Sequence, residues 1–214
     1  MIRKSTYSLM LALTLIAMLS AGARAQAPDP ENIRGQITRV EASSIEVKTA
    51  NGKTVMLTTN GTTSVFSLTK ASFTEVQFGS YVGAVAMRDE RYSPIVRDSL
   101  SWLHNGFELR IFDESLRGIA LGHKKWDQPA GAIMAHGWVD DMEVRVLSIK
   151  YGPTEEEETD VEVPRDAPIH RMSIADKGLL KTGAHIFAGA QKTGDGKYSA
   201  VFVIVGKDGI VPKL

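Results

Sequence analysis

From residue 30 onward, apolar and polar positions alternate along much of the chain, which predicts β-strands with one buried and one solvated face. Residues 35–59, "GQITRVEASSIEVKTANGKTVMLTT", show the pattern clearly. Asn51-Gly52 separates two alternating runs, and both residue types tolerate positive φ, so we expect a hairpin with a type I′ turn there. Residues 79–87 and 93–103 predict further strands.

The order of these patterns occurs twice. Residues 137–151 resemble residues 35–49, with Gly137 aligned on Gly35; residues 179–191 resemble 75–87, and residues 197–206 resemble 91–102. A repeated order of strands indicates two copies of one small unit. The alternative is that the two halves are similar only because all strand-rich sequences resemble one another.

Each copy contains five strand patterns and one turn-rich piece, at residues 68–79 and 173–183. Five strands with an interposed turn or short helix are typical of a closed OB-like barrel, in which closure removes exposed sheet edges. The expected fold is therefore all-β, with two tandem small OB-like β-barrels at residues 30–106 and 137–214, joined by a turn-rich strap at 107–136. One β-sandwich over the whole chain is the alternative.

The N-terminus has the features of a secretory signal peptide over residues 1–25. Arg3 and Lys4 precede the apolar run "LMLALTLIAML", and Ala23-Arg24-Ala25 follows as a small-x-small cleavage pattern. The run is shorter than the roughly 20 apolar residues of a membrane span. We expect export to the periplasm, cleavage near Ala25, and no membrane span in the mature chain.

Charge and cysteine content narrow the function classes. Of 25 basic residues three lie in residues 1–25, so the mature chain has 22 basic against 25 acidic residues. That balance argues against nucleic acid as a partner, since such proteins carry a basic patch. The chain has no cysteine, which excludes disulfides, thiolate metal sites and cysteine nucleophiles.

The strap holds the densest group of reactive side chains, in "IFDESLRGIALGHKKWDQPAG" (residues 111–131). Residues 112–118 predict one helical turn. A structural strap pinned by Trp126 is one interpretation. The other is a ligand pocket between the barrels, with His123, Lys124, Trp126 and Asp127 around its mouth. Aromatic residues on a concave barrel face add further candidates for ligand contact. They are Tyr81, Tyr92, Trp102, Trp138 and Phe187.

Metal binding is a second hypothesis for the strap. His123, Asp127 and His136 could converge, and a zinc site without cysteine needs several histidines or carboxylates. No two histidines stand three or four residues apart, so the sequence does not show the convergence.

Sequence signatures of catalysis are absent. The chain contains no G-x-S-x-G, no GxGxxG and no P-loop pattern. Asp140 and Asp141 are adjacent and would point to opposite faces of a strand, which makes them poor acid–base partners.

The order "IFDESLRGIALGHKKWD", a second β-rich half and the ending "VGKDGIVP" resemble a group of short exported alphaproteobacterial proteins with a central GHRPWD-like motif. Gly122, His123, Trp126 and Asp127 match that motif, and Arg117 and Gly118 match an Arg-Gly pair that precedes it in the group, whereas Lys124 and Lys125 replace its Arg-Pro. Members often carry the automatic label "metal ABC transporter permease". A permease spans the bilayer with apolar helices, which this mature chain lacks. The resemblance implies an exported protein of two OB-like halves and no particular reaction.

We therefore expect an exported, non-catalytic binding or accessory protein whose partner is a small molecule, a metal or an envelope protein. A metal-binding protein that uses the strap histidines, and an envelope enzyme with an unrecognised site, are the alternatives.

Overall fold

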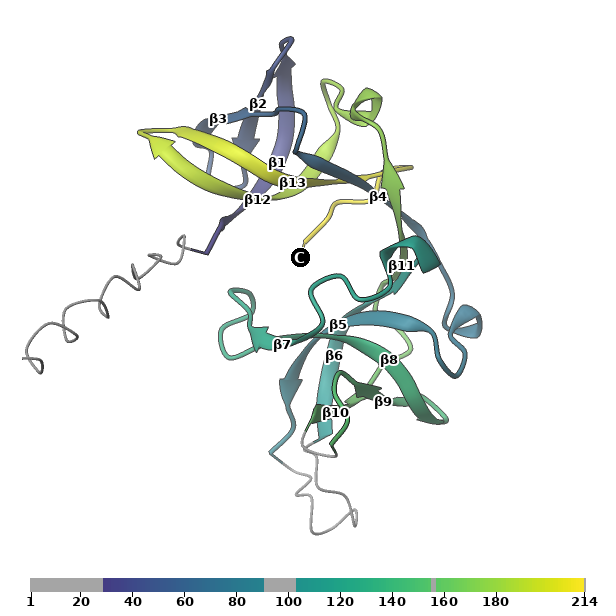
Figure 1. Ribbon diagram of the computed structural model, residues 1–214. Coiled ribbons are helices and arrows are strands. Elements are labelled where there is room, and N and C mark those ends of the chain that lie inside the picture. Colours follow the sequence, from purple (N-terminus) through teal and green to yellow (C-terminus); the bar gives the residue numbers. More distant parts are fainter. Residues whose placement is uncertain (1–28, 91–102, 155–156, 214) are drawn as a thin grey trace, which may run out of the picture.

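The computed structural model describes residues 29–90, 103–154 and 157–213, and these fold almost entirely into β-strands (Figure 1). The expected signal peptide, Tyr92 and Trp102 lie outside the described residues. Within the described ranges, no helix has the length and apolar character needed to cross a membrane.

One closed barrel, barrel A, contains strands from both ends of the chain. They are β1 (Glu31–Val40), β2 (Ser44–Thr49), β3 (Thr54–Thr58), β12 (His185–Gly194) and β13 (Lys197–Gly206). The antiparallel order is β13-β12-β1-β2-β3, and parallel pairing of β13 with β3 closes the barrel. It forms the upper part of Figure 1.

A second closed barrel, barrel B, contains strands from the middle of the chain. They are β5 (Tyr81–Arg88), β6 (Leu103–Phe112), β8 (Ile133–Glu143), β9 (Val146–Lys150) and β10 (Glu158–Glu162). The antiparallel order is β6-β5-β8-β9-β10, closed by parallel pairing of β10 with β6. The expectation of an all-β fold with two small OB-like barrels is therefore confirmed.

Two further strands connect the barrels. β4 (Ser64–Lys70) and β11 (Ile169–Ala175) pair antiparallel with each other, and β4 also pairs with β13 while β11 pairs with β6. A short 3₁₀ turn follows each of them: η1 (Phe73–Glu75) and η4 (Lys177–Leu179). These turns lie in the two predicted turn-rich pieces. The pairings join both barrels into one continuous 13-stranded sheet.

The strand pairing does not follow the predicted boundaries at 30–106 and 137–214. Barrel B is built from residues 81–162 and is inserted between the two parts of barrel A, residues 31–58 and 185–206. Thus β5 pairs with β8, and β1 with β12. The alternation predicts which segments are strands and in what order, but it carries no information on which strand each one pairs with.

The two barrels nevertheless repeat local details. In β1–β2 the register shifts just after the pair Ile37–Val47, and in β8–β9 it shifts just after Val139–Ile149. A Cβ on Gly35 would lie 2.3 Å from the carbonyl oxygen of Lys48, and one on Gly137 would lie 2.2 Å from that of Lys150. Glycine at both positions lets the two backbones approach closely.

The hairpin at Asn51-Gly52 is present between β2 and β3, but its turn is not type I′. Gly52 has φ +80°, whereas Asn51 is not among the residues with positive φ. Hydrogen bonds from Thr49 N to Lys53 O and from Gly52 N to Thr49 O close a longer loop. Such three-residue loops place one αL residue, here Gly52, after an ordinary turn.

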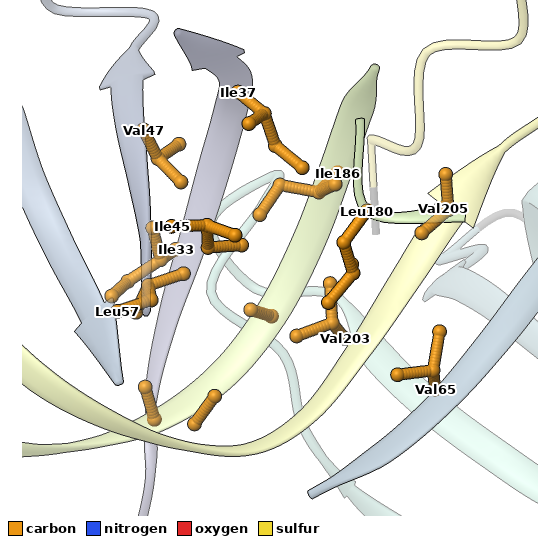
Figure 2. Packing of buried hydrophobic residues seen from close by; sticks show 13 residues of the cluster. Ile33, Ile37, Ile45, Val47, Leu57, Val65, Leu180, Ile186, Val203 and Val205 are labelled. Atoms are coloured by element: carbon orange, nitrogen blue, oxygen red, sulfur yellow. The ribbon is translucent and has the colours of Figure 1, made fainter. Parts of the chain in front are cut away.

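Each barrel has its own apolar core. Figure 2 shows that of barrel A, where Ile37, Val47, Leu57, Ile186 and Val203 point inward from β1, β2, β3, β12 and β13. The core of barrel B includes Val82, Leu109, Val139, Leu147 and Val161, all fully buried. These are the inward positions of the alternating pattern.

A third apolar cluster, the interbarrel layer, is made by outward-facing side chains of both barrels and of the connecting strands. Its buried members are Phe66, Leu68, Tyr81, Phe112, Leu116, Met172, Phe187 and Ile204. Parts of these strands are therefore buried on both faces, as in β5, where every residue from 81 to 86 is buried.

Candidate functional site

A cavity of about 450 Å³ lies in the interbarrel layer. Ligand sites for small molecules typically have volumes of about 300–1,000 Å³, mostly apolar walls and a few polar groups. The walls come from β4, β6, β8, β11, β12, β13 and the strap. They consist of Phe66, Arg110, Phe112, Ile119, Ala120, Leu121, Gly122, His123, Lys124, Trp126, Met134, His136, Met172, Phe187, Phe202 and Ile204.

The strap is shorter than predicted and joins different elements. Because β6 continues to Phe112 and β8 begins at Ile133, it spans residues 113–132 and links two strands of barrel B. Its predicted helical turn is η2 (Glu114–Leu116), and β7 (Gly122–Lys125) pairs antiparallel with β8. The segment was expected to connect two barrels, but β4 and β11 do so instead.

The strap still holds the two barrels together, through contacts at its far end. The carboxylate of Asp127 accepts hydrogen bonds from both terminal nitrogens of Arg34 on β1, each at 2.7 Å. The Arg34 guanidinium also lies 4.8 Å above the ring of Phe187 on β12. Burial alone would raise the pKa of Asp127, but the hydrogen bonds and charge of Arg34 outweigh it and lower that pKa.

His136, on β8, is fixed in one orientation. Its Nδ1 lies 3.1 Å from the carbonyl oxygen of Ile119 in the strap, and the hydroxyl of Tyr81 donates to the same oxygen at 2.8 Å. Since a carbonyl only accepts, Nδ1 carries the proton. The ring packs edge-on against Phe112, with centroids 5.1 Å apart. A side chain at Gly83 would collide with it, at 2.8 Å from Cδ2.

The imidazole of His136 is neutral near pH 7. Burial lowers its pKa to about 4, and the positive charges of Arg110 and Lys124 act in the same direction. With the proton on Nδ1, the other nitrogen, Nε2, carries a lone pair and can only accept a hydrogen bond. Nε2 is buried and has no hydrogen-bond partner among the described residues.

Trp126 presents the complementary group. Its indole packs on Phe187 of barrel A, with ring centroids 5.8 Å apart, and the ammonium of Lys124 lies 5.5 Å from its ring. The indole Nε1–H can only donate. This atom is also buried without a partner in the described part of the chain. Buried polar groups are rarely left unpaired, so two on side chains of one cavity require an explanation.

A buried polar cluster adjoins the cavity. Arg110, which lines it, donates from Nε to Glu108 at 3.0 Å, and Nδ1 of His170 lies 3.2 Å from the same carboxylate oxygen. Burial acts to raise the pKa of Glu108, but the hydrogen bond from His170 and the charge of Arg110 outweigh it and lower that pKa. The Arg110 charge is thus compensated within the protein.

The ligand-contact predictions divide into two groups. His123, Lys124, Trp126 and Phe187 line the cavity. Asp127 lies beside it and binds Arg34, while Trp138 and Tyr81 are not among the lining residues. Arg110 and Met172 were missed, and the available signal was the charged pair Glu108 and Arg110, which alternates with apolar residues at the end of β6.

The predicted metal site of His123, Asp127 and His136 is not assembled. In the ranges that the structure covers, no three His, Asp or Glu side chains come together to hold a metal ion. Asp127 uses both oxygens on Arg34. His136 is tied to the strap backbone, and His123 packs against Tyr151 with ring centroids 5.2 Å apart.

Comparison with protein-family models, with curated proteins and with solved structures finds no match for this chain.

Proposed function

We propose that this protein is an exported, non-catalytic binding protein that holds an apolar small molecule in the cavity between its two barrels. The observation that carries the proposal is the cavity of about 450 Å³ in the interbarrel layer, whose walls are largely aromatic and apolar.

The composition of the walls supports an apolar ligand. Phe66, Phe112, Phe187, Phe202 and Trp126 supply aromatic surface, and Met134 and Met172 supply flexible side chains that adapt to irregular shapes. The acidic side chains described near the walls are both paired, Glu108 with Arg110 and His170, and Asp127 with Arg34. Among the residues that the structure describes, no pair of convergent carboxylates lines the cavity, and this supports binding rather than acid–base catalysis.

The N-terminal sequence supports a location in the periplasm, and the resemblance of the strap to exported proteins points the same way. The paired glycines Gly35 and Gly137, and the matching register shifts, support the proposal that the two halves of the chain are copies of one ancestral unit.

The test uses N-phenyl-1-naphthylamine, an uncharged probe that fluoresces in apolar sites. We expect saturable binding of one molecule per chain. Met134→Trp, which adds bulk to the cavity wall, should weaken binding at least tenfold. Met142→Trp is the matched control, because Met142 lies on the same strand, is 41% exposed and does not line the cavity.

Circular dichroism and thermal unfolding establish that both variants are folded. Absence of saturable binding by the unsubstituted protein, or equal binding by folded Met134→Trp, would contradict the proposal.

A further inference from the structure

We propose that the natural ligand is an amphipathic anion, whose apolar body fills the cavity between the barrels and whose acidic group pairs with Lys124 at the rim of that cavity. This inference rests on the proposed function, which requires only the apolar body, and it adds the acidic group.

The pairing of β7 with β8 places the Lys124 side chain on the cavity side of the strap. Lys124 lies opposite Met134, and both residues line the cavity. Because side chains alternate along a strand, Lys125 points to the other side, and it is not among the lining residues. The Lys124 ammonium lies 5.5 Å from the centroid of the Trp126 ring, which is part of the cavity wall. Since Lys124 is also exposed, its ammonium lies where the cavity meets solvent.

The positive charges around the cavity differ in whether they are compensated. None of the described residues that line the cavity is acidic. Arg110 is nevertheless compensated, because Glu108 accepts from it at 3.0 Å and both side chains are only 4% exposed. Within the described ranges, the ammonium of Lys124 has no carboxylate at ion-pairing distance. Its contact with the Trp126 ring leaves the positive charge in place, because the ring has no net charge.

The charge of Lys124 also acts on the cavity wall. Burial is the main cause that lowers the pKa of His136, and the charges of Arg110 and Lys124 lower this pKa further. Asp127, three residues along the strap, does not offset the charge of Lys124, because both of its carboxylate oxygens accept from Arg34. An anionic group at the rim would therefore be attracted, whereas a cationic group would be repelled.

The test compares two fluorescent probes that differ by one anionic group. N-Phenyl-1-naphthylamine is uncharged, and 8-anilinonaphthalene-1-sulfonate has the same ring systems with an added sulfonate. Fluorescence titration at low ionic strength gives the Kd of each probe for the full mature chain and for its variants. We expect the sulfonate probe to bind the unsubstituted chain at least as tightly as the uncharged probe.

Charge reversal at Lys124 separates recognition of the anion from binding of the apolar rings. Lys124→Glu should weaken binding of the sulfonate probe about tenfold, because an exposed attraction is replaced by a repulsion of similar size. The same variant should change the Kd of the uncharged probe by less than about twofold, since that probe has no charge to pair. Lys124→Gln, which removes the charge without reversing it, should weaken binding of the sulfonate probe about threefold.

Lys125→Glu is the matched control. It changes the net charge by the same amount on the adjacent residue, which does not line the cavity. The Kd of either probe should change by less than about twofold in this variant, since an exposed charge outside the cavity is screened by solvent. Circular dichroism establishes that all three variants are folded.

The outcomes separate the two proposals. If neither probe binds the unsubstituted chain, the proposed function is wrong and the present inference is wrong with it. If both probes bind, but Lys124→Glu weakens them equally or Lys125→Glu weakens the sulfonate probe as much as Lys124→Glu does, the cavity still binds apolar molecules. The pairing of an acidic group with Lys124 is then overturned. Weaker binding of the sulfonate probe than of the uncharged probe by the unsubstituted chain would overturn it as well.

Discussion

At the scale of single residues, His136 shows how a polar side chain is kept neutral inside an apolar layer. The ring lies against Gly83, which leaves room for it, and against Phe112. One nitrogen is satisfied by the strap backbone and the other remains open. Its protonation would place a charge in the interbarrel layer beside the positive side chains of Arg110 and Lys124.

This position of His136 predicts a pH dependence of stability. The pKa is about 4 in the folded protein and 6.5 ordinarily, so below pH 6.5 the unfolded chain binds a proton that the folded chain does not. The free energy of unfolding should therefore fall as the pH decreases from 6.5 to 4, by about 3 kcal/mol in total. Urea unfolding at a series of pH values measures this.

The variant His136→Phe provides the comparison, because every other titrating group is retained. Its stability should change less between pH 6.5 and 4, and the difference between the two curves isolates the histidine. Parallel curves would show that the pKa of His136 is the same in the folded and unfolded states, and would contradict this prediction.

The residues of the site could be predicted only in part. His123, Lys124 and Trp126 were found because they are concentrated in one turn-rich segment, and Phe187 because aromatic side chains on a barrel face are candidates in general. Arg110 and Met172 come from strands whose partners the sequence does not reveal. Side chains from seven elements meet at this site only because of how the strands pair. The alternation of apolar and polar residues does not specify that pairing.

At the scale of elements, the strap is held at several points by different interactions. The backbone of β7 pairs with β8, the Ile119 carbonyl accepts from Tyr81 and His136, and Asp127 binds Arg34 across the interface. The last of these contacts reaches barrel A, as do the packing of Trp126 on Phe187 and the Arg34 guanidinium, which lies 6.0 Å from the Trp126 ring centroid. The strap is therefore part of barrel B, and the end that carries Trp126 and Asp127 contacts barrel A.

The strength of that clamp can be measured with a double-mutant cycle of Arg34→Gln and Asp127→Asn. The coupling energy should be about 0.5–1 kcal/mol, because the pair is bidentate but the Asp127 side chain is 41% exposed. It should decrease at high salt. A coupling indistinguishable from zero would mean that the Arg34–Asp127 pair does not help to hold the strap on barrel A.

At the scale of the whole molecule, the sequence predicts two small β-barrels but does not predict which strands each barrel contains. The matched patterns at 35–49 and 137–151 correspond to β1–β2 and β8–β9, which are equivalent hairpins in the two barrels. The strand pairs that complete each barrel, however, come from the opposite half of the chain. Nothing in a period-2 pattern distinguishes pairing within a half from pairing between halves.

The insertion of barrel B within barrel A predicts the behaviour of fragments. Residues 71–170 contain every strand of barrel B and its whole core, so this fragment should give a β-type circular dichroism spectrum and unfold cooperatively in urea. The fragment 30–106 should not, because β1, β2 and β3 lack β12 and β13, and β5 and β6 lack β8. Cooperative unfolding of 30–106 would instead favour contiguous tandem domains.

The parallel contact between β13 and β3 also has a consequence for the order of events during synthesis. Residues 56–58 pair with residues 197–199, which are synthesised about 140 positions later, so this ladder cannot form before β13 has been made. Until then, the β2–β3 hairpin has unpaired strand edges that can pair with another nascent copy of the chain. Premature termination before His185 should therefore yield aggregates rather than a smaller folded protein. A chaperone that binds the nascent chain would have to cover β1, β2 and β3 until β12 and β13 have been made.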